Sequence, residues 1–362
     1  MSPRLLLVIA LPFLVAAAPG RQVAAVLGAN LQRPDWSPGG ERLSYEANFH
    51  DKRIVELYVG EPDTPRFSRV RAAERSLNPM TAGFSTGVAV NQVVHQLSWS
   101  PSDLNRFCYT ASNAAQDYDI YLDASGPMAQ SPGADGDARW SPDGRYIAFT
   151  SARTGEGDLY LMDRQTPSDP ARRLTQLPGT SEVDSAWSRD GKRLAFVAHG
   201  AGGDHLWLLG RLDGSPVQLT TLPGSQIRPS FSPSADLVAF YANAEDAGRW
   251  DLYAVPLQPG VVPKLLATGV LPNALGPSWS PDGAHIVYVR NDDEAFDPIS
   301  AVRVSDPTRV VDLDFGTVGN GDIDLVQRGD GASWIAWVAQ GRAQDALRDY
   351  HRIFIAKLPT LP

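Results

Sequence analysis

Polar residues recur at one fixed place along this chain, three positions before each copy of an aromatic motif. These positions hold Arg33, Gln96, Asp137, Asp184, Arg228, Gly276 and, by a looser alignment, Asp322. Two arginines and three aspartates on one surface would bind a polar or zwitterionic ligand, or a charged peptide, better than an apolar ligand. A competing interpretation is that they only satisfy turns, because an Asp side chain readily hydrogen-bonds the backbone that follows it.

Histidines are the other side chains that could do chemistry. Five of the six fall in or beside segments expected on the same surface, namely His50, His95, His199, His205 and His351. No His-x-His pair and no Cys/His spacing holds two metal ligands together, so the sequence predicts no metal ligand and no cofactor.

A formal match to the nucleophile elbow of serine hydrolases occurs at Gly83–Gly87, which reads GFSTG. The elbow works because a strand, a turn and a helix of an α/β sheet hold the serine in a strained position. No alternating α/β region follows here, so we predict no catalytic residue.

The motif that positions these residues is WSPDGRYIAF at Trp140–Phe149. Its copies begin at Trp36, Trp99, Trp140, Trp187, Phe231, Trp279 and Leu325, which lie 63, 41, 47, 44, 48 and 46 residues apart. A period of this length fits four short strands and their turns, which is one blade of a β-propeller. A helical repeat would need apolar residues at three- and four-residue spacing.

Each copy divides into strands by its local chemistry. Pro-Asp-Gly favours a tight turn, a short apolar strand such as IAF follows, and a third strand with an aromatic residue comes next. We therefore predict an all-β fold of four-stranded antiparallel blades packed as a closed ring. The Pro-Asp-Gly hairpins should emerge on the face opposite the polar residues.

Ring closure can be predicted from the two ends of the repeat array. The last copy has three strands and ends with His351–Leu358, whereas Gln22–Leu27 precedes the first copy and has no other obvious partner. We expect these two segments to pair. This arrangement favours seven blades, with six as the alternative if the degenerate copy at Leu325 is irregular.

The N-terminus resembles a secretory leader. Met1–Arg4 is positively charged, Leu5–Val15 is apolar and shorter than the ~20 residues that span a membrane, and small residues follow. Pro19 should hinder cleavage after Ala18, so we expect cleavage after Ala17. The mature chain would then be a single propeller domain, residues 18–362, in the periplasm or secreted, with no transmembrane segment; the alternative is an uncleaved anchor helix.

The composition of the chain limits the classes of partner that we expect. The formal net charge of -9 disfavours nucleic acid, because nonspecific binding to phosphates needs a positive surface. The single cysteine, Cys108, lies in the second strand of its blade, where we expect it to pack in the core without a disulfide.

One long insertion interrupts the array between Trp36 and Trp99. The segment 66–96 should contain an outer strand, a short charged helix with Arg69, Arg71 and Arg75, and a loop over residues 78–87 that overhangs the polar face. Long structured insertions in compact folds tend to be functional, although a loop without contacts would fit equally well.

WSPDG followed by IAF and DLYLMD, repeated after a leader, resembles the propeller of the TolB family. Similar propellers accompany prolyl-oligopeptidase-like enzymes and form the oligogalacturonate lyases. The resemblance covers about residues 22–358 and is specific for the fold, but propellers host unrelated functions. The α/β domain of about 100 residues that the resemblance would place before a six-bladed TolB propeller has no room here, so its partner contacts are not carried over.

Three functions fit this sequence. The first is an exported monomeric scaffold that binds a protein or peptide of the cell envelope. Its binding surface would be the mouth of the central channel of the ring, where we expect the polar residues Arg33, Gln96, Asp137, Asp184, Arg228 and Asp322. The second is a propeller enzyme, a lyase or hydrolase with or without a metal, that uses the axial funnel. The third is a module that binds a small ligand or a glycan.

Overall fold

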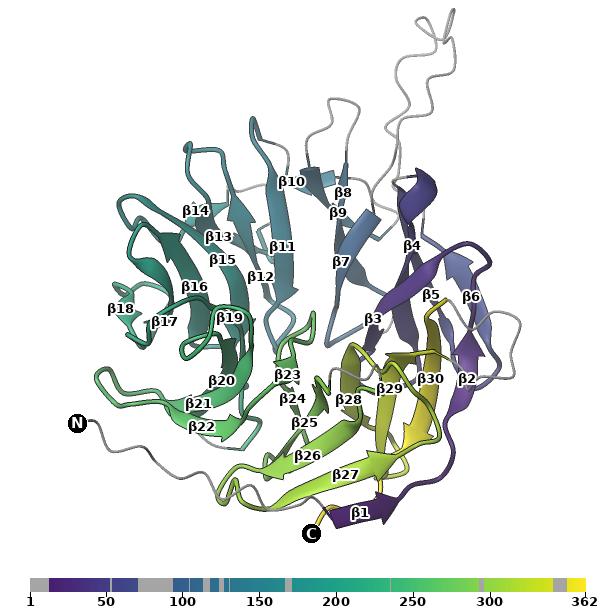
Figure 1. Cartoon of the computed structure of the whole chain (residues 1–362). Helices are drawn as coiled ribbons and strands as arrows, with labels where there is room; N and C mark the ends of the chain where they lie inside the picture. Colours follow the sequence, from purple (N-terminus) through teal and green to yellow (C-terminus); the bar gives the residue numbers. More distant parts are fainter. Residues whose placement is uncertain are drawn as a thin grey trace, which may run out of the picture.

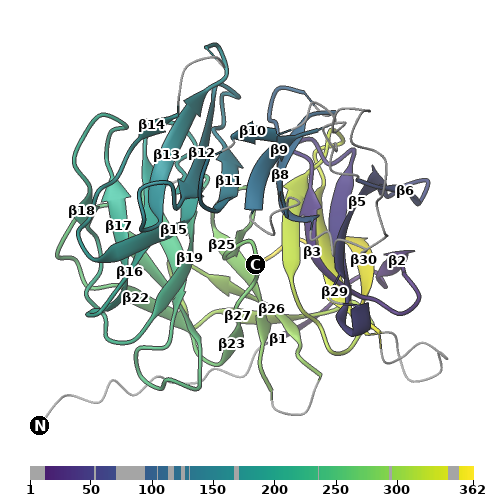
Figure 2. The same ribbon diagram turned by 90° about the horizontal axis from the view of Figure 1, so that it is seen from above.

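The computed structural model describes residues 13–52, 54–70, 94–103, 105–112, 118–123, 127–129, 131–166, 171–234, 236–292, 296–340 and 350–362. Its strands form seven sheets that follow one another around a central axis (Figures 1 and 2), and apart from one 3-10 turn, η1 (His50–Lys52), the described secondary structure is all β. The predicted seven-bladed propeller is confirmed. No helix of the described residues is long and apolar enough to cross a membrane.

Blades are numbered here by the order of their innermost strands, and each is given from the axis outward. Blade 1 contains β3 (Asn30–Trp36), β4 (Leu43–Phe49), β5 (Ile54–Glu61) and β6 (Arg66–Arg69). Blade 2 contains β7 (Val94–Trp99), β8 (Phe107–Ser112), β9 (Tyr118–Leu122) and β10 (Pro127–Ala129). Blade 3 contains β11 (Asp135–Trp140), β12 (Tyr146–Ser151), β13 (Asp158–Asp163) and β14 (Arg172–Arg173).

The remaining blades follow the same order. Blade 4 contains β15 (Thr180–Trp187), β16 (Leu194–Gly200), β17 (Gly203–Leu209) and β18 (Val217–Gln218). Blade 5 contains β19 (Gln226–Phe231), β20 (Leu237–Ala242), β21 (Asp251–Pro256) and β22 (Lys264–Ala267). Blade 6 contains β23 (Val270–Leu271), β24 (Ser278–Trp279), β25 (His285–Arg290), β26 (Ile299–Arg303) and β27 (Val310–Asp314), and blade 7 contains β28 (Ile323–Gln327), β29 (Ser333–Ala339), β30 (Arg352–Lys357) and β2 (Arg21–Ala24).

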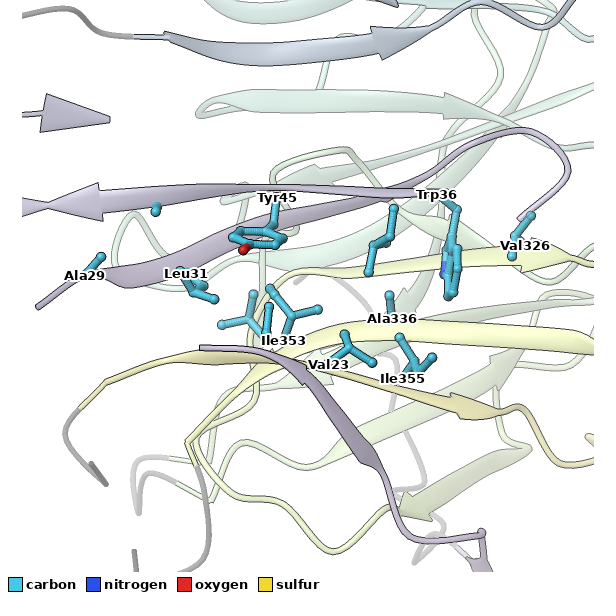
Figure 3. Close-up of a cluster of buried hydrophobic side chains, with 13 residues drawn as sticks. Val23, Ala29, Leu31, Trp36, Tyr45, Val326, Ala336, Ile353 and Ile355 are labelled. Atoms are coloured by element: carbon cyan, nitrogen blue, oxygen red, sulfur yellow. The ribbon is translucent and has the colours of Figure 1, made fainter. Parts of the chain in front are cut away.

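The ring closes as the sequence predicts. β2 is the outermost strand of blade 7 and runs antiparallel to β30, with Arg21 opposite Ile355 and Gln22 opposite Phe354. Between blades 7 and 1, Leu31, Trp36 and Tyr45 pack against Val326, Ala336, Ile353, Ile355 and Val23 (Figure 3). Burial of each large aliphatic side chain in such a cluster contributes about 1.5–3 kcal/mol, so the N-terminal strand and the last blade stabilise each other.

Hydrogen bonds of the hairpin after each anchor explain why the WSPDG sequence recurs. In blade 3 the Ser141 hydroxyl donates to the Asp143 carboxylate over 2.6 Å and accepts from the Tyr146 N–H over 2.9 Å. The Gly144 N–H donates to the Ser141 carbonyl, and Gly144 has φ of 71°, a conformation that favours glycine. Serine, aspartate and glycine together close this turn between the first two strands.

The anchor tryptophans link neighbouring blades. The indole N–H of Trp99, Trp187 and Trp279 donates to the carbonyl of Asp35, Arg139 and Ser230 respectively, over 3.1–3.2 Å, and each acceptor directly precedes the anchor of the blade before. The repeat leads one to expect all anchor tryptophans to be buried between blades; Trp140 and Trp279 are buried, whereas Trp187 is only half-buried.

Blade 6 departs from the pattern at both of its edges. Its innermost strand is split into β23 and β24, which both pair with β25. Its outermost strand, β27, carries an additional strand, β1 (Phe13–Ala16), in parallel orientation.

The predicted core role of Cys108 is confirmed, since this residue is fully buried in β8 and burial raises the pKa of its thiol to about 12.

Candidate functional site

The predicted site residues share an unusual backbone conformation. Five of them have positive φ although none is glycine: Arg33 (52°), Gln96 (56°), Asp137 (51°), Asp184 (51°) and Arg228 (56°). In each of these five blades the pairing of the innermost strand with the second strand shifts register at this position, which is a β-bulge. The equivalent Gly276 of blade 6 has φ of 93°. The repeat therefore contains a bulge that the sequence analysis did not recognise.

The bulges free backbone N–H groups, and side chains of the preceding blade accept them. The Arg33 N–H donates to Asp322 over 3.0 Å, the Asp137 N–H to the Gln96 side chain over 3.1 Å, and the Arg228 N–H to Asp184 over 3.2 Å. Glu46 accepts from the Gln96 N–H over 2.8 Å. These four bonds form a belt along the inside of the channel, because blades 7, 1, 2 and 4 each satisfy the bulge of the blade that follows.

Ion pairs reinforce the belt. Arg33 pairs with Glu46 at 3.4 Å, and Arg228 with Asp184 at 3.5 Å. Arg139, which directly precedes an anchor, pairs with Asp137 at 3.0 Å. The five bulged residues thus lie inside the channel, two to four residues after the start of their strands, and not on its outer rim, because the innermost strands begin before the bulges.

The sequence did not reveal one pair of interacting, half-buried carboxyl groups. Asp35 and Asp324 directly precede the anchors of blades 1 and 7, and Asp324 accepts the Trp36 N–H over 2.7 Å and the Leu325 N–H over 2.8 Å. Burial raises the pKa of Asp324 to about 7, and burial together with the Asp324 carboxyl raises the pKa of Asp35. Asp35 and Asp324 could have been recognised in the sequence by their common position immediately before an anchor, which Arg139 occupies in blade 3.

A loop of blade 6 fills the channel beside this pair. Residues 272–277 connect β23 to β24 and lie near the centre of the ring (Figure 1). The Asn273 side-chain amide donates to the Gly276 carbonyl, the Ser278 hydroxyl and the Ile323 carbonyl over 2.7–2.9 Å. Leu275 lines a cavity of only about 10 Å³ with Arg33, Asp35 and Arg139, which is too small for more than one water molecule.

Two of the predicted site residues hold this loop in place. The Ala274 N–H donates to Asp322 over 2.7 Å, and the Arg228 guanidinium donates to the Ala274 carbonyl. We call residues 272–277 the channel plug. The plug is thus bonded to blades 5 and 7, and its residues Pro272 and Asn273 form part of the wall of the neighbouring cavity.

A large cavity opens at the mouth beside the plug, over blades 1, 6 and 7 only. It has a volume of about 470 Å³ and is called the open sector; its polar lining residues are Asn30, Gln32, His50, Asn273, Asp297, Asn320, Asp322, Gln340 and His351. The described lining contains two carboxylates, two imidazoles and five amides, and no Lys or Arg. Such a lining favours ligands with many hydrogen-bonding groups and disfavours anions.

Three side chains of the open sector are available for a ligand. His50, Gln340 and His351 make no side-chain hydrogen bond within the described part of the chain. Burial lowers the pKa of His351, which the nearby Asp322 carboxylate opposes, and burial next to Asp292 raises the pKa of Asp297. Asn30 and Asn320 are held by other partners, the His351 N–H and the Asp297 carbonyl, over 3.1 and 2.8 Å.

In blades 3, 4 and 5, three polar side chains that approach the mouth are already bonded to other groups of the protein. Asp135, Glu182 and Gln226 stand five positions before their anchors and are fully buried. Asp135 pairs with Arg153 at 3.2 Å, Glu182 accepts from the Thr175 and Thr180 hydroxyls over 2.8 and 2.6 Å, and Gln226 bonds the Leu222 carbonyl over 2.8 Å. We call these three residues and their partners the closed sector.

The histidines are spread over several blades. His50 and His351 meet in the open sector. His95 lies edge-on against Tyr118 in blade 2, His199 pairs with Asp204 at 2.8 Å, and His205 bonds Gln226 at 3.1 Å. Among the described residues no three His, Cys, Asp or Glu side chains are grouped so that they could hold a metal ion.

The insertion is described only in part. Arg66–Arg69 forms the predicted outer strand, so Arg69 belongs to β6 and not to a helix. Arg71, Arg75, the loop 78–87 and the GFSTG sequence lie outside the described residues, and so does most of the predicted leader, residues 1–12.

Seven antiparallel blades, closed by the N-terminal strand β2, define a β-propeller with a polar cavity at the mouth of its channel. The sequence model of the TolB β-propeller domain matches residues 88–305, more than half of the chain. The chain belongs to the TolB β-propeller domain family. No protein with a curated description matches it.

Solved structures support the same fold. TolB from Acinetobacter baumannii is 19% identical, with a TM-score of 0.52, and the alignment covers 78% of this chain and 62% of that one. A puromycin-hydrolyzing peptidase from Mycobacterium tuberculosis is 14% identical, with a TM-score of 0.60 and coverage of 97% and 57%. The propeller domain of the Trilobed protease from Pyrococcus furiosus is 12% identical, with a TM-score of 0.52 and coverage of 78% and 83%. The chain therefore spans less than two thirds of the first two relatives, and at these identities the likeness concerns the fold.

Proposed function

We propose that this protein is an exported binding scaffold that captures a protein or peptide partner of the cell envelope in the open sector of the channel mouth. The leader, cleaved after Ala17, would direct the propeller of residues 18–362 to the periplasm or the medium, where it would act as a monomer. The observation that carries the proposal is the cavity of about 470 Å³ with its polar lining, to which the plug contributes Pro272 and Asn273.

The chemistry of the cavity fits a polypeptide. Amide side chains both donate and accept hydrogen bonds, as the backbone of an extended peptide requires. Five amides and the apolar Leu31, Leu271 and Val338 line the same cavity, so hydrogen bonds and apolar contact are offered together.

The six residues predicted for binding divide into two roles in this proposal. Asp322 lines the open sector and could contact the ligand. Arg33, Gln96, Asp137, Asp184 and Arg228 hold the belt and the plug, and would act by keeping the wall of the site rigid.

The test measures partner capture by the purified exported protein with variants at His50 and Gln340. His50 is exposed and neither side chain makes a hydrogen bond among the described residues, so His50→Ala and Gln340→Ala should leave the melting temperature unchanged. Lys192→Ala in the hairpin of the opposite face is the control, because its exposed side chain is remote from the mouth. Loss of capture in the control, with full capture by both mouth variants, would refute the site.

A second candidate function is a lyase or hydrolase acting in the same cavity. The observation that favours it is the presence of His50, His351 and Asp297 in one lining, since a proton-transfer reaction could use such groups. Turnover of peptide or oligosaccharide substrates that disappears in His351→Ala, while binding persists, would support this function over the scaffold.

A further inference from the structure

The outermost strands of the blades differ in length. β14 and β18 have two residues, β10 has three, and β2, β6 and β22 have four, whereas β27 has five, Val310–Asp314. Short edge strands limit the addition of foreign strands. The pairing of β27 with β26 is regular, whereas that of β2, β10 and β22 shifts register. Blade 6 thus has the longest regular edge in the described ring.

This edge is already occupied by a strand of the same chain. β1 lies along β27 in parallel, with Phe13 opposite Val311, Val15 opposite Leu313 and Ala16 opposite Asp314 (Figures 1 and 2). The Gly20 N–H donates to the Phe315 carbonyl over 2.9 Å.

The side chains of this added segment alternate in their surroundings. Val15 and Ala17 pack against the buried cluster that contains Val311 and Leu313, whereas Leu14 is 72% exposed. The edge of β27 therefore favours a segment with small aliphatic residues at alternate positions, those of Val15 and Ala17.

A second cavity accompanies the edge. It has a volume of about 600 Å³ and is lined mainly by apolar groups, among them Leu14, Phe296, Pro298 and Phe315. Phe296 is 56% exposed, which is unusual for a large aromatic side chain and marks candidate interaction surfaces.

We propose that the edge of β27 is a strand-addition site that, in the exported protein, binds an extended apolar segment of a partner polypeptide in parallel orientation. The inference rests on the proposed export, because cleavage after Ala17 removes β1 and Ala17, including the Leu14 that lines the cavity, and uncovers the edge of β27. Main-chain hydrogen bonds would supply affinity, and the positions of Val15 and Ala17 would supply specificity.

The acidic residues of β27 favour a partner over a second copy of this chain. Asp312 and Asp314 alternate along the strand, and Asp314 is exposed. Pairing of two such edges would bring like charges together, which destabilises a cross-strand contact. A segment like residues 13–20 carries no charge and avoids this repulsion.

The experiment uses the exported protein, whose N-terminus is first determined by mass, and a fluorescent peptide with the sequence of residues 13–17, which stops where the exported chain would begin. We expect saturable binding by anisotropy and slower amide exchange in Val310–Asp314. A peptide with Val15→Asp should bind at least about tenfold more weakly, equivalent to about 1.4 kcal/mol, whereas Leu14→Ser should change affinity less than about twofold because Leu14 is exposed. In the protein, Phe296→Ala should weaken binding and the control Val262→Ala, at an exposed position of blade 5, should not.

Orientation is tested with thiols. Cys108 is fully buried, so a cysteine placed by Asp314→Cys is the reactive one. A peptide with Ala16→Cys should form a disulfide with it, and a peptide with Phe13→Cys should not, because the parallel register pairs Ala16 with Asp314.

Several outcomes would overturn the inference. They are absence of binding to folded exported protein, equal binding of the Val15→Asp peptide, preferential coupling of the Phe13→Cys peptide, or dimers protected at β27. If the mass shows that residues 13–16 are retained, the proposed cleavage is wrong, and the site is tested in the full chain. There the peptide should bind the Val15→Asp chain and not the unaltered one, and failure to do so would refute the site itself.

Discussion

The two sectors of the channel mouth are built from the same repeat and differ in how their polar groups are used. In the closed sector, Asp135, Glu182 and Gln226 are buried and bonded to groups of their own blade or of the blade before it. In the open sector, the split innermost strand of blade 6 (β23 and β24) and the innermost strand of blade 1 (β3) border a cavity. His50, Gln340 and His351 line this cavity. The cavity of this propeller thus lies where the repeat becomes irregular, because neighbouring irregular blades leave some of their polar side chains facing open space.

The largest expected effect concerns the packing that both sectors share. Trp279→Ala removes a buried indole and its bond to the Ser230 carbonyl, so we expect a loss of about 3–5 kcal/mol in the free energy of unfolding. Trp187→Ala should cost less, because Trp187 is half-buried. Denaturant melts of the two variants would show the reverse order if the open sector were loosely packed.

The plug should be the next most sensitive element. Asn273→Ala removes a buried amide that bonds three groups and leaves the Ser278 hydroxyl and two carbonyls without it. A loss of about 1–2 kcal/mol is expected, because the Gly276 carbonyl loses this donor while the Ser278 hydroxyl still donates to the Ile323 carbonyl. Amide exchange should accelerate in residues 272–277 and not in the closed sector; uniform acceleration would mean that the plug is not a separate unit.

The closed sector should respond to pH through Glu182. Burial raises the pKa of this carboxyl to about 7, above its ordinary value, so between pH 5 and 7 the folded state binds more protons than the unfolded state. Stability due to this group is therefore lost as pH rises. Glu182→Gln should be more stable than the unaltered protein by about 1–2 kcal/mol at pH 8, less than the full shift because the amide cannot accept from both threonine hydroxyls.

At pH 5 the advantage of Glu182→Gln should vanish. Melts at the two pH values check this difference. The same advantage at both pH values would show that Glu182 is charged in the folded protein throughout this range.

The smallest effect on stability is expected in the open sector itself. Gln340→Ala should change the free energy of unfolding by less than about 0.5 kcal/mol, since its side chain makes no hydrogen bond among the described residues. Thr180→Val in the closed sector provides the contrast, because it removes a donor to buried Glu182. Equal losses of unfolding free energy in the two variants would show that the two sectors do not differ in how their polar side chains are bonded.

Much of the fold could be predicted because its signals are local. The Ser141, Asp143 and Gly144 turn explains the recurring motif within a few residues, and the three-strand last copy correctly predicts that the N-terminal strand closes the ring. The bulge at Arg33 and its equivalents could not be found this way. Its stabilising partners lie in the preceding blade, and for Arg33 the partner is Asp322, 289 residues away.

The sequence by itself determined the all-β repeat, the seven blades, the burial of Cys108 and the positions that line the channel. Only the tertiary structure decided which of those positions are engaged and which face a cavity. The physical reason is that the bulges of blades 1, 2, 3 and 5 take their acceptors from the preceding blade, and that the open sector lies where blades 6, 7 and 1 meet. Asn30 and His351, which adjoin there, are 321 residues apart, so no local pattern could have placed them together.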